Sequence, residues 1–276
     1  MSIRLNFQKE MPTEILHGDA LEKLKTLKTD TIQCCVTSPP YWGVRDYGIE
    51  GQIGAGPLPI YIEDLLKVFK EVKRVLKPDG TLWLNIGDCY TSGNRKTRAP
   101  DPKNKSREMS YRPKTPKGLK KKDLIGVPWK IAFALQETGW YLRSEIIWHK
   151  PNCQPESVKD RPTKAHEQIF LLSKFPKYLY NGWDVKEPGK KSGTRNRRTI
   201  WTIPTTPFPG AHFATFPPKL VELCVRAGSN SKDIVLDPFF GSGTTGEVCQ
   251  KLGRDCVGIE LNELYVEIAN ERLGIF

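Results

Sequence analysis

Residues 233–260 read DIVLDPFFGSGTTGEVCQKLGRDCVGIE, and this stretch indicates the class of fold. Its first residues are rich in branched apolar side chains and predict a buried strand. A glycine-rich turn leads into a helical segment that Gly253 ends, and a second apolar run carries Glu260 near its end. A strand, a helix and a strand in this order predict a βαβ unit with two parallel strands.

The turn of this unit predicts a ligand site. Ligands of open α/β sheets bind at the carboxyl ends of the strands, where the N–H groups at a helix start can hold a carboxylate or phosphate. Gly241, Gly243 and Gly246 meet the G-x-G-x-x-G spacing, and a carboxylate at Glu260 can accept both hydroxyls of a ribose. From these residues alone, a dinucleotide site, an S-adenosylmethionine site and a purely structural turn all stay open.

Strands and helices alternate along the rest of the chain. One helix face is formed in 60–77 by Ile62, Leu65, Phe69, Val72 and Leu76. Further helices are expected at 19–27, 127–139, 217–229 and 262–274, and strands at 14–17, 31–37, 81–87, 141–150 and 166–174. This alternation predicts an α/β fold with a mostly parallel sheet. The segments 88–125 and 175–213 lack apolar periodicity, and we expect irregular chain there.

A second motif, TSPPYW, occupies residues 37–42 and ends the predicted strand over 31–37. Two consecutive prolines fix the backbone and donate no hydrogen bonds, so their carbonyl oxygens face outward as acceptors. An aromatic ring follows directly. A planar base with an exocyclic amine requires such an arrangement, with acceptors for its N–H groups and a ring against its face. The alternative is a rigid loop that only caps the strand.

Together, TSPPYW and DPFFGSGTT (237–245) resemble the amino-group DNA methyltransferases of the permuted β arrangement, in which the S/D-P-P-Y motif precedes the F-x-G-x-G cofactor motif. The resemblance covers nearly the whole chain, including RSEIIWHKP (143–151) and DRPTKAHEQIFLLSK (160–174). It implies a Rossmann-like, circularly permuted S-adenosylmethionine-dependent methyltransferase fold. The sheet would have seven strands and be mostly parallel, with one antiparallel strand.

The same resemblance assigns roles to residues. The catalytic motif corresponds to Ser38, Pro39, Pro40 and Tyr41, with Tyr41 stacked on a base flipped out of the duplex and direct in-line attack of its amine. The amino acid part of S-adenosylmethionine would be held by Asp237, Phe239, Gly241, Gly243, Thr244 and Thr245. Glu260 would hold the ribose, and Asp19 would lie near the adenine. Phe216 and Lys219 would lie near the methionine end.

Ser38 bears on the choice of base. In this family, a serine in the first position accompanies mostly cytosine N4 methylation and an aspartate mostly adenine N6 methylation, so we expect cytosine N4, with adenine N6 as the alternative. A catalytically inactive DNA-binding module and an NAD-dependent oxidoreductase are the rival classes. Two intact motifs argue against the first, and the second leaves Ser-Pro-Pro-Tyr unexplained.

Positive charge is concentrated in two segments. The chain holds 43 Lys and Arg against 31 Asp and Glu, a net charge of +12. Residues 93–122 contain 12 basic and 2 acidic side chains, and 186–198 contain 6 and 1. Both segments predict a polyanion partner, here duplex DNA. The candidate DNA contacts are Arg95, Lys96, Arg98, Arg107, Arg112, Lys120, Lys121, Lys122, Arg195, Arg197 and Arg198.

These features predict a catalytic domain over 1–174 and 214–276, with 93–122 as an inserted DNA-contacting loop and 175–213 as a target-recognition region. No apolar stretch is long enough to span a bilayer, and no signal-peptide pattern begins the chain, so we expect a cytoplasmic protein. The seven cysteines form no C-x-x-C pair, and no metal site is predicted. A cognate restriction endonuclease is a candidate partner, and the oligomeric state stays open.

Overall fold

Eight strands form one sheet within residues 13–44, 51–92, 95, 97, 112–189, 193–206 and 216–275, which are the residues described by the computed structural model. The order across the sheet is β1 (Thr13–His17), β10 (Asp255–Glu260), β9 (Ile234–Asp237), β2 (Ile32–Thr37), β3 (Leu76–Ile86), β5 (His166–Ser173), β4 (Tyr141–His149) and β8 (Ile200–Thr202). In this part of the chain only β5 runs against the other strands, pairing antiparallel with β3 and β4. The prediction of a mostly parallel sheet with one antiparallel strand is confirmed.

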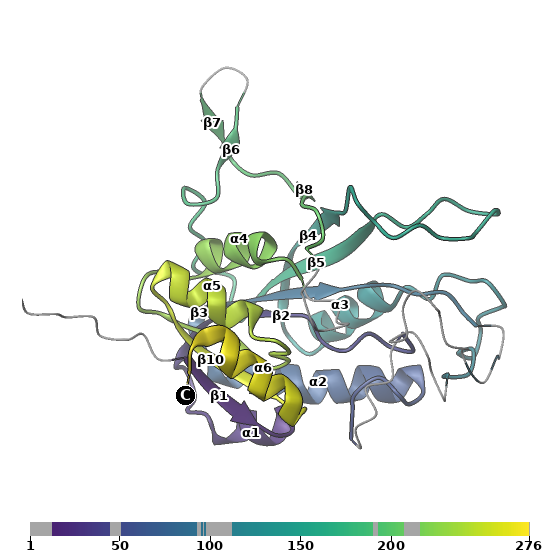
Figure 1. The fold of residues 1–276 in the computed structure, drawn as a ribbon, viewed down its shortest axis with the longest axis horizontal. Helices are drawn as coiled ribbons and strands as arrows, with labels where there is room; N and C mark the ends of the chain where they lie inside the picture. The colour runs from purple at the N-terminus through teal and green to yellow at the C-terminus, as the bar shows by residue number, and fades with distance from the viewer. Residues whose placement is uncertain are drawn as a thin grey trace, which may run out of the picture.

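Helices cover both faces of this sheet, as Figure 1 shows. One face carries α1 (Ala20–Thr26), α2 (Leu58–Val75) and α3 (Val127–Glu137), and the other carries α4 (Pro218–Gly228), α5 (Thr244–Leu252) and α6 (Glu263–Leu273). Alternate side chains of one strand reach opposite cores: Cys35 packs with the α2 face and Cys34 with the α4 face. Central strands buried on both faces explain the continuous apolar runs of the sequence.

The chain connections diverge between β9 and β2. After β2 the chain passes through α2 to β3, whereas after β9 it passes through α5 to β10 on the other side. Open α/β sheets bind ligands at such a switch point, outside the carboxyl ends of the strands. The two sequence motifs follow β2 and β9 directly, so the fold brings them to the same edge of the sheet.

Two predicted boundaries differ from the structure. The helix expected to reach residue 77 ends at Val75, and β3 begins at Leu76, which is extended and pairs with Ile32 of β2. Pro78 disfavours a helical conformation at the residue before it, so the chain leaves the helix before that residue.

The segment expected to be irregular, 175–213, contains three short strands: β6 (Glu187–Pro188), β7 (Thr194–Arg195) and β8. The first two form a ribbon that projects from the body of the molecule (Figure 1). The third adds an eighth strand to the sheet, where seven were expected. Trp201 of β8 stacks on Trp83 of β3 with ring centroids 6.3 Å apart, and this contact attaches the segment to the sheet.

No helix among the described residues is long and apolar enough to cross a membrane. The same residues hold no group of three or more His, Cys, Asp or Glu side chains arranged to bind a metal ion.

Candidate active site

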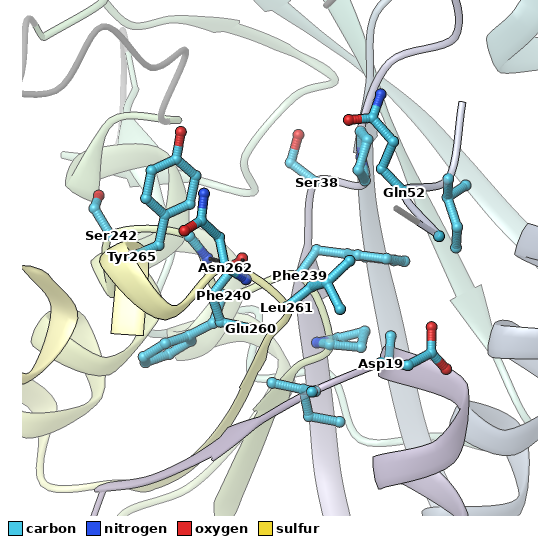
Figure 2. Close-up of a pocket in the computed structure, with 18 of the residues that line it drawn as sticks. Asp19, Ser38, Gln52, Phe239, Phe240, Ser242, Glu260, Leu261, Asn262 and Tyr265 are labelled. Atoms are coloured by element: carbon cyan, nitrogen blue, oxygen red, sulfur yellow. Dashed lines mark hydrogen bonds between the residues drawn. The ribbon is translucent and has the colours of Figure 1, made fainter. Parts of the chain in front are cut away.

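A pocket opens at the carboxyl ends of β1, β2, β9 and β10, beside the switch point. Figure 2 shows Ser38 and Gln52 on one side of it and Ser242, Asn262 and Tyr265 on the other. Its wall includes the following residues that the sequence singled out: Asp19, Ser38, Pro40, Phe216, Phe239, Gly241, Thr244 and Glu260. The two motifs therefore form one site.

The glycine-rich turn is fastened to the end of β10 through Glu260. One carboxylate oxygen of Glu260 accepts a hydrogen bond from the Gly241 N–H at 2.7 Å, and the other accepts from the Asn262 N–H at 2.8 Å. Burial raises the pKa of Glu260 above its ordinary value, although these two backbone groups act in the opposite direction. Each carboxylate oxygen has a second lone pair, so Glu260 can still accept from a ligand while it holds the turn.

Asp237 lies beneath the pocket and not on its wall. Its carboxylate accepts from the Thr37 hydroxyl at 2.6 Å, from the Thr245 hydroxyl at 2.7 Å and from the Phe239 N–H at 3.1 Å. Burial raises the pKa of this carboxyl to about 6, and the three donors oppose the rise. Asp237 therefore joins the end of β2 to the start of α5, and both Asp237 and Thr245 support the pocket from below.

Three further candidates for the donor site lie in different settings. Asp19 lines the pocket and caps α1 by accepting from the Glu22 N–H at 3.0 Å. Gly243 packs against α6, where a Cβ would lie 3.1 Å from the Cβ of Ala269, and its φ of 80° favours glycine. Lys219 does not line the pocket, because its ammonium pairs with Glu222 on the mostly exposed face of α4.

The Ser-Pro-Pro-Tyr segment presents Ser38 and Pro40 to the pocket and buries Pro39. The Pro40 carbonyl accepts from the Tyr61 hydroxyl of α2 at 2.8 Å, which fixes the segment from below. The Tyr41 ring packs against Gly87, where a Cβ would lie 2.6 Å from Cε2 of the ring.

The Tyr41 hydroxyl enters a cluster that the sequence analysis did not single out. It donates to Glu167 at 2.7 Å, and the amide nitrogen of Asn85 donates to it at 2.8 Å. The same amide nitrogen lies 3.2 Å from the Ser38 hydroxyl oxygen and 3.2 Å from the Glu167 carboxylate. Lys150 forms an ion pair with Glu167 and stands over the Trp148 ring at 4.0 Å from its centroid.

The position of Glu167 follows from the direction of β5. Its neighbours β3 and β4 bring their carboxyl ends to the pocket edge, whereas the antiparallel β5 brings its first residues there. A search restricted to residues after strands misses Glu167 for this reason. Asn85 did carry a signal, since an amide inside the apolar run of β3 must find partners when buried.

A family model described as DNA methylase (N6_N4_Mtase) matches residues 32–271. The chain belongs to this DNA methylase family. The methylase is a DNA methyltransferase, and its methyl donor is S-adenosylmethionine. The pocket suits this donor, because it combines apolar walls at Phe216, Phe239 and Ile259 with carboxylates at Asp19 and Glu260.

Relatives match the methylase over nearly its whole length. Type II methyltransferase M.SmaI of Serratia marcescens is 62% identical over 263 residues, covering 94% of the methylase and 90% of the relative. Type II methyltransferase M.Cfr9I of Citrobacter freundii is 58% identical over 260 residues, covering 94% and 87%. Identity at this level over this length extends to the whole catalytic domain.

Solved structures share the fold. A DNA modification methylase of Thermus thermophilus, TTHA0409, in complex with S-adenosyl-L-methionine superposes with a TM-score of 0.65 and 27% identity, covering 95% of the methylase and 93% of that chain. PvuII DNA methyltransferase (cytosine-N4-specific) superposes with a TM-score of 0.71 and 23% identity, covering 94% and 87%. The Rossmann-like methyltransferase fold implied by the sequence motifs is confirmed.

The basic segments of the methylase differ in how their side chains are held. Lys120, Lys121 and Lys122 are exposed, and Lys122 pairs with Asp160 at 2.5 Å. Arg95 donates to the Ser92 carbonyl at 3.1 Å, and Arg112 is partly buried. Three of the candidate contacts, Lys96, Arg98 and Arg107, lie outside the described residues.

The arginines of the β6–β7 ribbon are engaged within the ribbon. Arg195 and Arg198 both pair with Glu187, at 2.8 Å and 2.6 Å. Arg197 donates to the carbonyl oxygen of Val185 at 2.6 Å. A base contact by any of these three requires it to exchange a partner, so the exposed lysines at 120–122 are the more accessible cations.

Proposed function

We propose that the methylase transfers a methyl group from S-adenosylmethionine to the exocyclic N4 amino group of cytosine at a specific site in duplex DNA, with the target base flipped into the pocket. The observation that carries this proposal is Ser38: a neutral hydroxyl stands on the wall of the donor pocket, directly after β2. In related amino-group methyltransferases, serine at this position accompanies mostly cytosine N4 methylation.

The donor would be held between the two motifs. Gly241, Thr244 and Phe239 face the pocket from the turn before α5, Phe216 from the start of α4 and Asp19 from the start of α1. Glu260 would accept the ribose hydroxyls. Asp237, Gly243 and Thr245 would act indirectly by fixing this turn, and Lys219 is not part of the proposed site because it faces Glu222.

When bound, S-adenosylmethionine supplies an electrophilic methyl group on a positively charged sulfonium. The protein must make a poor nucleophile reactive, because the lone pair of an exocyclic amine is delocalised into the ring. The Ser38 oxygen and the Pro39 carbonyl would accept the two N–H groups, which draws electron density onto nitrogen and orients it. Positioning and electrostatics of this kind carry most of such a step. Tyr41 would contribute its ring face to the base.

The test uses amplified genomic DNA, which carries no methylation. The DNA is incubated with the enzyme and labelled S-adenosylmethionine, digested to nucleosides and separated. We expect N4-methylcytosine, and N6-methyladenine alone would overturn the choice of base in favour of adenine. Single-molecule sequencing of the same DNA identifies the target sequence.

Ser38→Ala tests the catalytic assignment. We expect methylation to fall by about 100-fold or more, while the dissociation constant for S-adenosylmethionine changes little. Ser242→Ala is a matched control, because its hydroxyl also lines the pocket but follows β9 and bonds Arg272. A Ser38→Ala rate within threefold of wild type would remove Ser38 from the mechanism.

The Type II names of the relatives lead us to extend the proposal to a cognate restriction endonuclease that cuts the same sequence. The DNA would be approached through Lys120–Lys122 and the β6–β7 ribbon. If the extension is right, DNA methylated to completion resists one Type II endonuclease whose site contains the methylated base.

A further inference from the structure

The cluster behind Ser38 contains a buried ion pair for which the proposed methyl transfer has no use. Only 16% of the Glu167 side chain and 17% of the Lys150 side chain are exposed. Burying two charges costs several kcal/mol of desolvation for each ion, so the pair is a weak source of stability. Its neighbours suggest another role, since Glu167 bonds Tyr41 and Asn85, and both of these bond Ser38.

We propose that Glu167, paired with Lys150, is a positioning residue that sets the direction of the hydrogen bonds reaching Ser38. This inference rests on the proposed function, because it explains how Ser38 becomes an acceptor for the target amine.

The direction begins at the carboxylate. An ionised carboxylate only accepts hydrogen bonds, so the Tyr41 hydroxyl, 2.7 Å away, must donate to Glu167. Burial by itself raises the pKa of Glu167, but Lys150, Tyr41 and Asn85 outweigh it and hold that pKa below its ordinary value. Lys164, in the connection before β5, adds a further positive charge that interacts with Glu167. Glu167 is therefore ionised at neutral pH.

Asn85 is oriented by the same carboxylate. Its amide nitrogen faces Glu167, Tyr41 and Ser38, because its oxygen would meet the acceptor Glu167 if the amide were reversed. This orientation leaves the Asn85 side-chain oxygen buried without a hydrogen-bond partner among the described residues. An unpartnered buried acceptor costs about 1–3 kcal/mol, so the orientation is imposed by the cluster and not by the needs of Asn85.

The consequence falls on Ser38. A hydroxyl has one donor hydrogen and two acceptor lone pairs. Because Tyr41 gives its hydrogen to Glu167, its oxygen can only accept from Ser38, 3.3 Å away. Asn85 occupies one lone pair of Ser38. The second lone pair is then available to the pocket, where an N–H of the target amine can use it.

Reversal of this direction would oppose catalysis. If Tyr41 donated to Ser38, then Tyr41 and Asn85 would occupy both Ser38 lone pairs. The Ser38 hydrogen would turn to the pocket and compete for the nitrogen lone pair that must attack the methyl group. An isosteric Glu167→Gln change produces this reversal, because the new amide can keep its oxygen on Lys150 and donate from its nitrogen to Tyr41.

The experiment measures single-turnover methylation for Glu167→Gln, Tyr41→Phe and the double variant. Phenylalanine keeps the ring of Tyr41 and removes only the hydroxyl. We expect each single variant to lower the rate by about 10- to 100-fold and the double variant to lower it no further, because both interrupt the same chain of hydrogen bonds. Donor affinity and thermal unfolding midpoints should stay near those of wild type.

Glu71→Gln is the matched control, since Glu71 pairs with Arg74 on α2 and is 18% exposed. It should retain wild-type activity. Rates of Glu167→Gln within twofold of wild type, or multiplicative losses in the double variant, would overturn the proposal. If Ser38→Ala is also active, the proposed function itself fails, and an inactive Ser38→Ala with active Glu167→Gln rejects only the role of Glu167.

A pH profile separates this role from a structural one. In Lys150→Met the cation is lost and burial dominates the pKa of Glu167, so the pKa rises. The rate should then fall as pH drops below neutrality, at a pH where wild type is still fully active, and Lys150→Arg should restore the wild-type profile. A Lys150→Met profile parallel to that of wild type would contradict the proposal.

Discussion

The two sides of the active site are constructed from different groups. On the donor side, main-chain N–H groups of Gly241 and Asn262 bond one carboxylate, Glu260, and the turn keeps its shape through positive φ angles. On the Ser38 side, the bonds run between side chains that come from separate elements: Asn85 from β3 and Glu167 from β5. A backbone site tolerates no added volume, whereas a side-chain cluster depends on which group donates and which accepts.

This difference sets what each side can change. The donor is the same molecule in every S-adenosylmethionine enzyme, and a fixed backbone cradle suits it. The target amine differs between cytosine and adenine, and hydrogen bonds to it are made by side chains that substitution can alter. Variants that add volume and variants that alter polarity should therefore separate the two sides.

The largest effect is expected from Gly258→Ala on the donor side. A Cβ at residue 258 of β10 would lie 2.4 Å from Cγ of Phe240, which lines the pocket. The ring and the turn must shift, and overpacking of this severity should cost about 3 kcal/mol of stability. Donor affinity should fall by about 100-fold, as measured by calorimetric titration with S-adenosylmethionine.

Gly56→Ala is the control for this change, because a Cβ there finds open space, with Ile60 Cγ2 nearest at 3.9 Å. It should bind the donor as wild type does. Full donor affinity in Gly258→Ala would show that the donor side adapts to added volume, and the contrast between the two sides would be lost.

The second effect concerns Asp237 and depends on pH. Burial raises its pKa from 3.8 to about 6, so between these values the folded protein binds a proton that the unfolded chain has released. Stability contributed by this group is present at low pH and is lost as pH rises through about 6. Asp237→Asn stays neutral, and its stability relative to wild type should rise by up to about 3 kcal/mol between pH 4 and pH 7.

Urea unfolding of both proteins across this pH range measures the difference. A gap that stays constant with pH would mean that Asp237 does not titrate in the folded protein as its burial implies. The hydrogen bonds from Thr37 and Thr245 would then dominate over desolvation on the donor side.

The donor side was largely predictable because its signal is local. Residues 237–245 contain the glycines and the acidic lead-in within one short stretch, and a βαβ pattern places them at a strand end. The Ser38 motif was also visible, but its partners stand at 85, 150 and 167. No local pattern joins residues that far apart in sequence. The reversed direction of β5 removed the remaining clue by placing Glu167 at the start of its strand.

Other differences have similar physical origins. Lys219 has the correct place in the chain for a donor contact, but the rotation of α4 directs its ammonium to Glu222. The strand β8 is three residues long and alternates weakly, and it is stabilised by stacking of Trp201 on Trp83 from another part of the chain. Sequence patterns specify which elements form more reliably than which side chains meet.

A smaller effect is expected from Gly87→Ala on the Ser38 side. The added Cβ would lie 2.6 Å from the Tyr41 ring and must displace the hydroxyl from Glu167 and Asn85. We expect the methylation rate constant to fall by about 10-fold, with donor affinity within twofold of wild type, measured on the same preparation. Loss of donor binding here would show that the two sides are coupled and not independent.

The smallest effect is expected from Lys120→Ala combined with Lys121→Ala, outside both sides of the pocket. These exposed lysines are proposed to contact phosphates, which position the duplex without reading its sequence. Removing two such contacts should lower the slope of log affinity against log salt by about 2, equally for target and non-target DNA. At saturating DNA and low salt, the methylation rate and the donor affinity should match wild type, because neither the Glu260 turn nor the Ser38 cluster includes these lysines. A change in target preference would instead assign them to base recognition, and loss of rate at saturation would make this loop a third component of the active site.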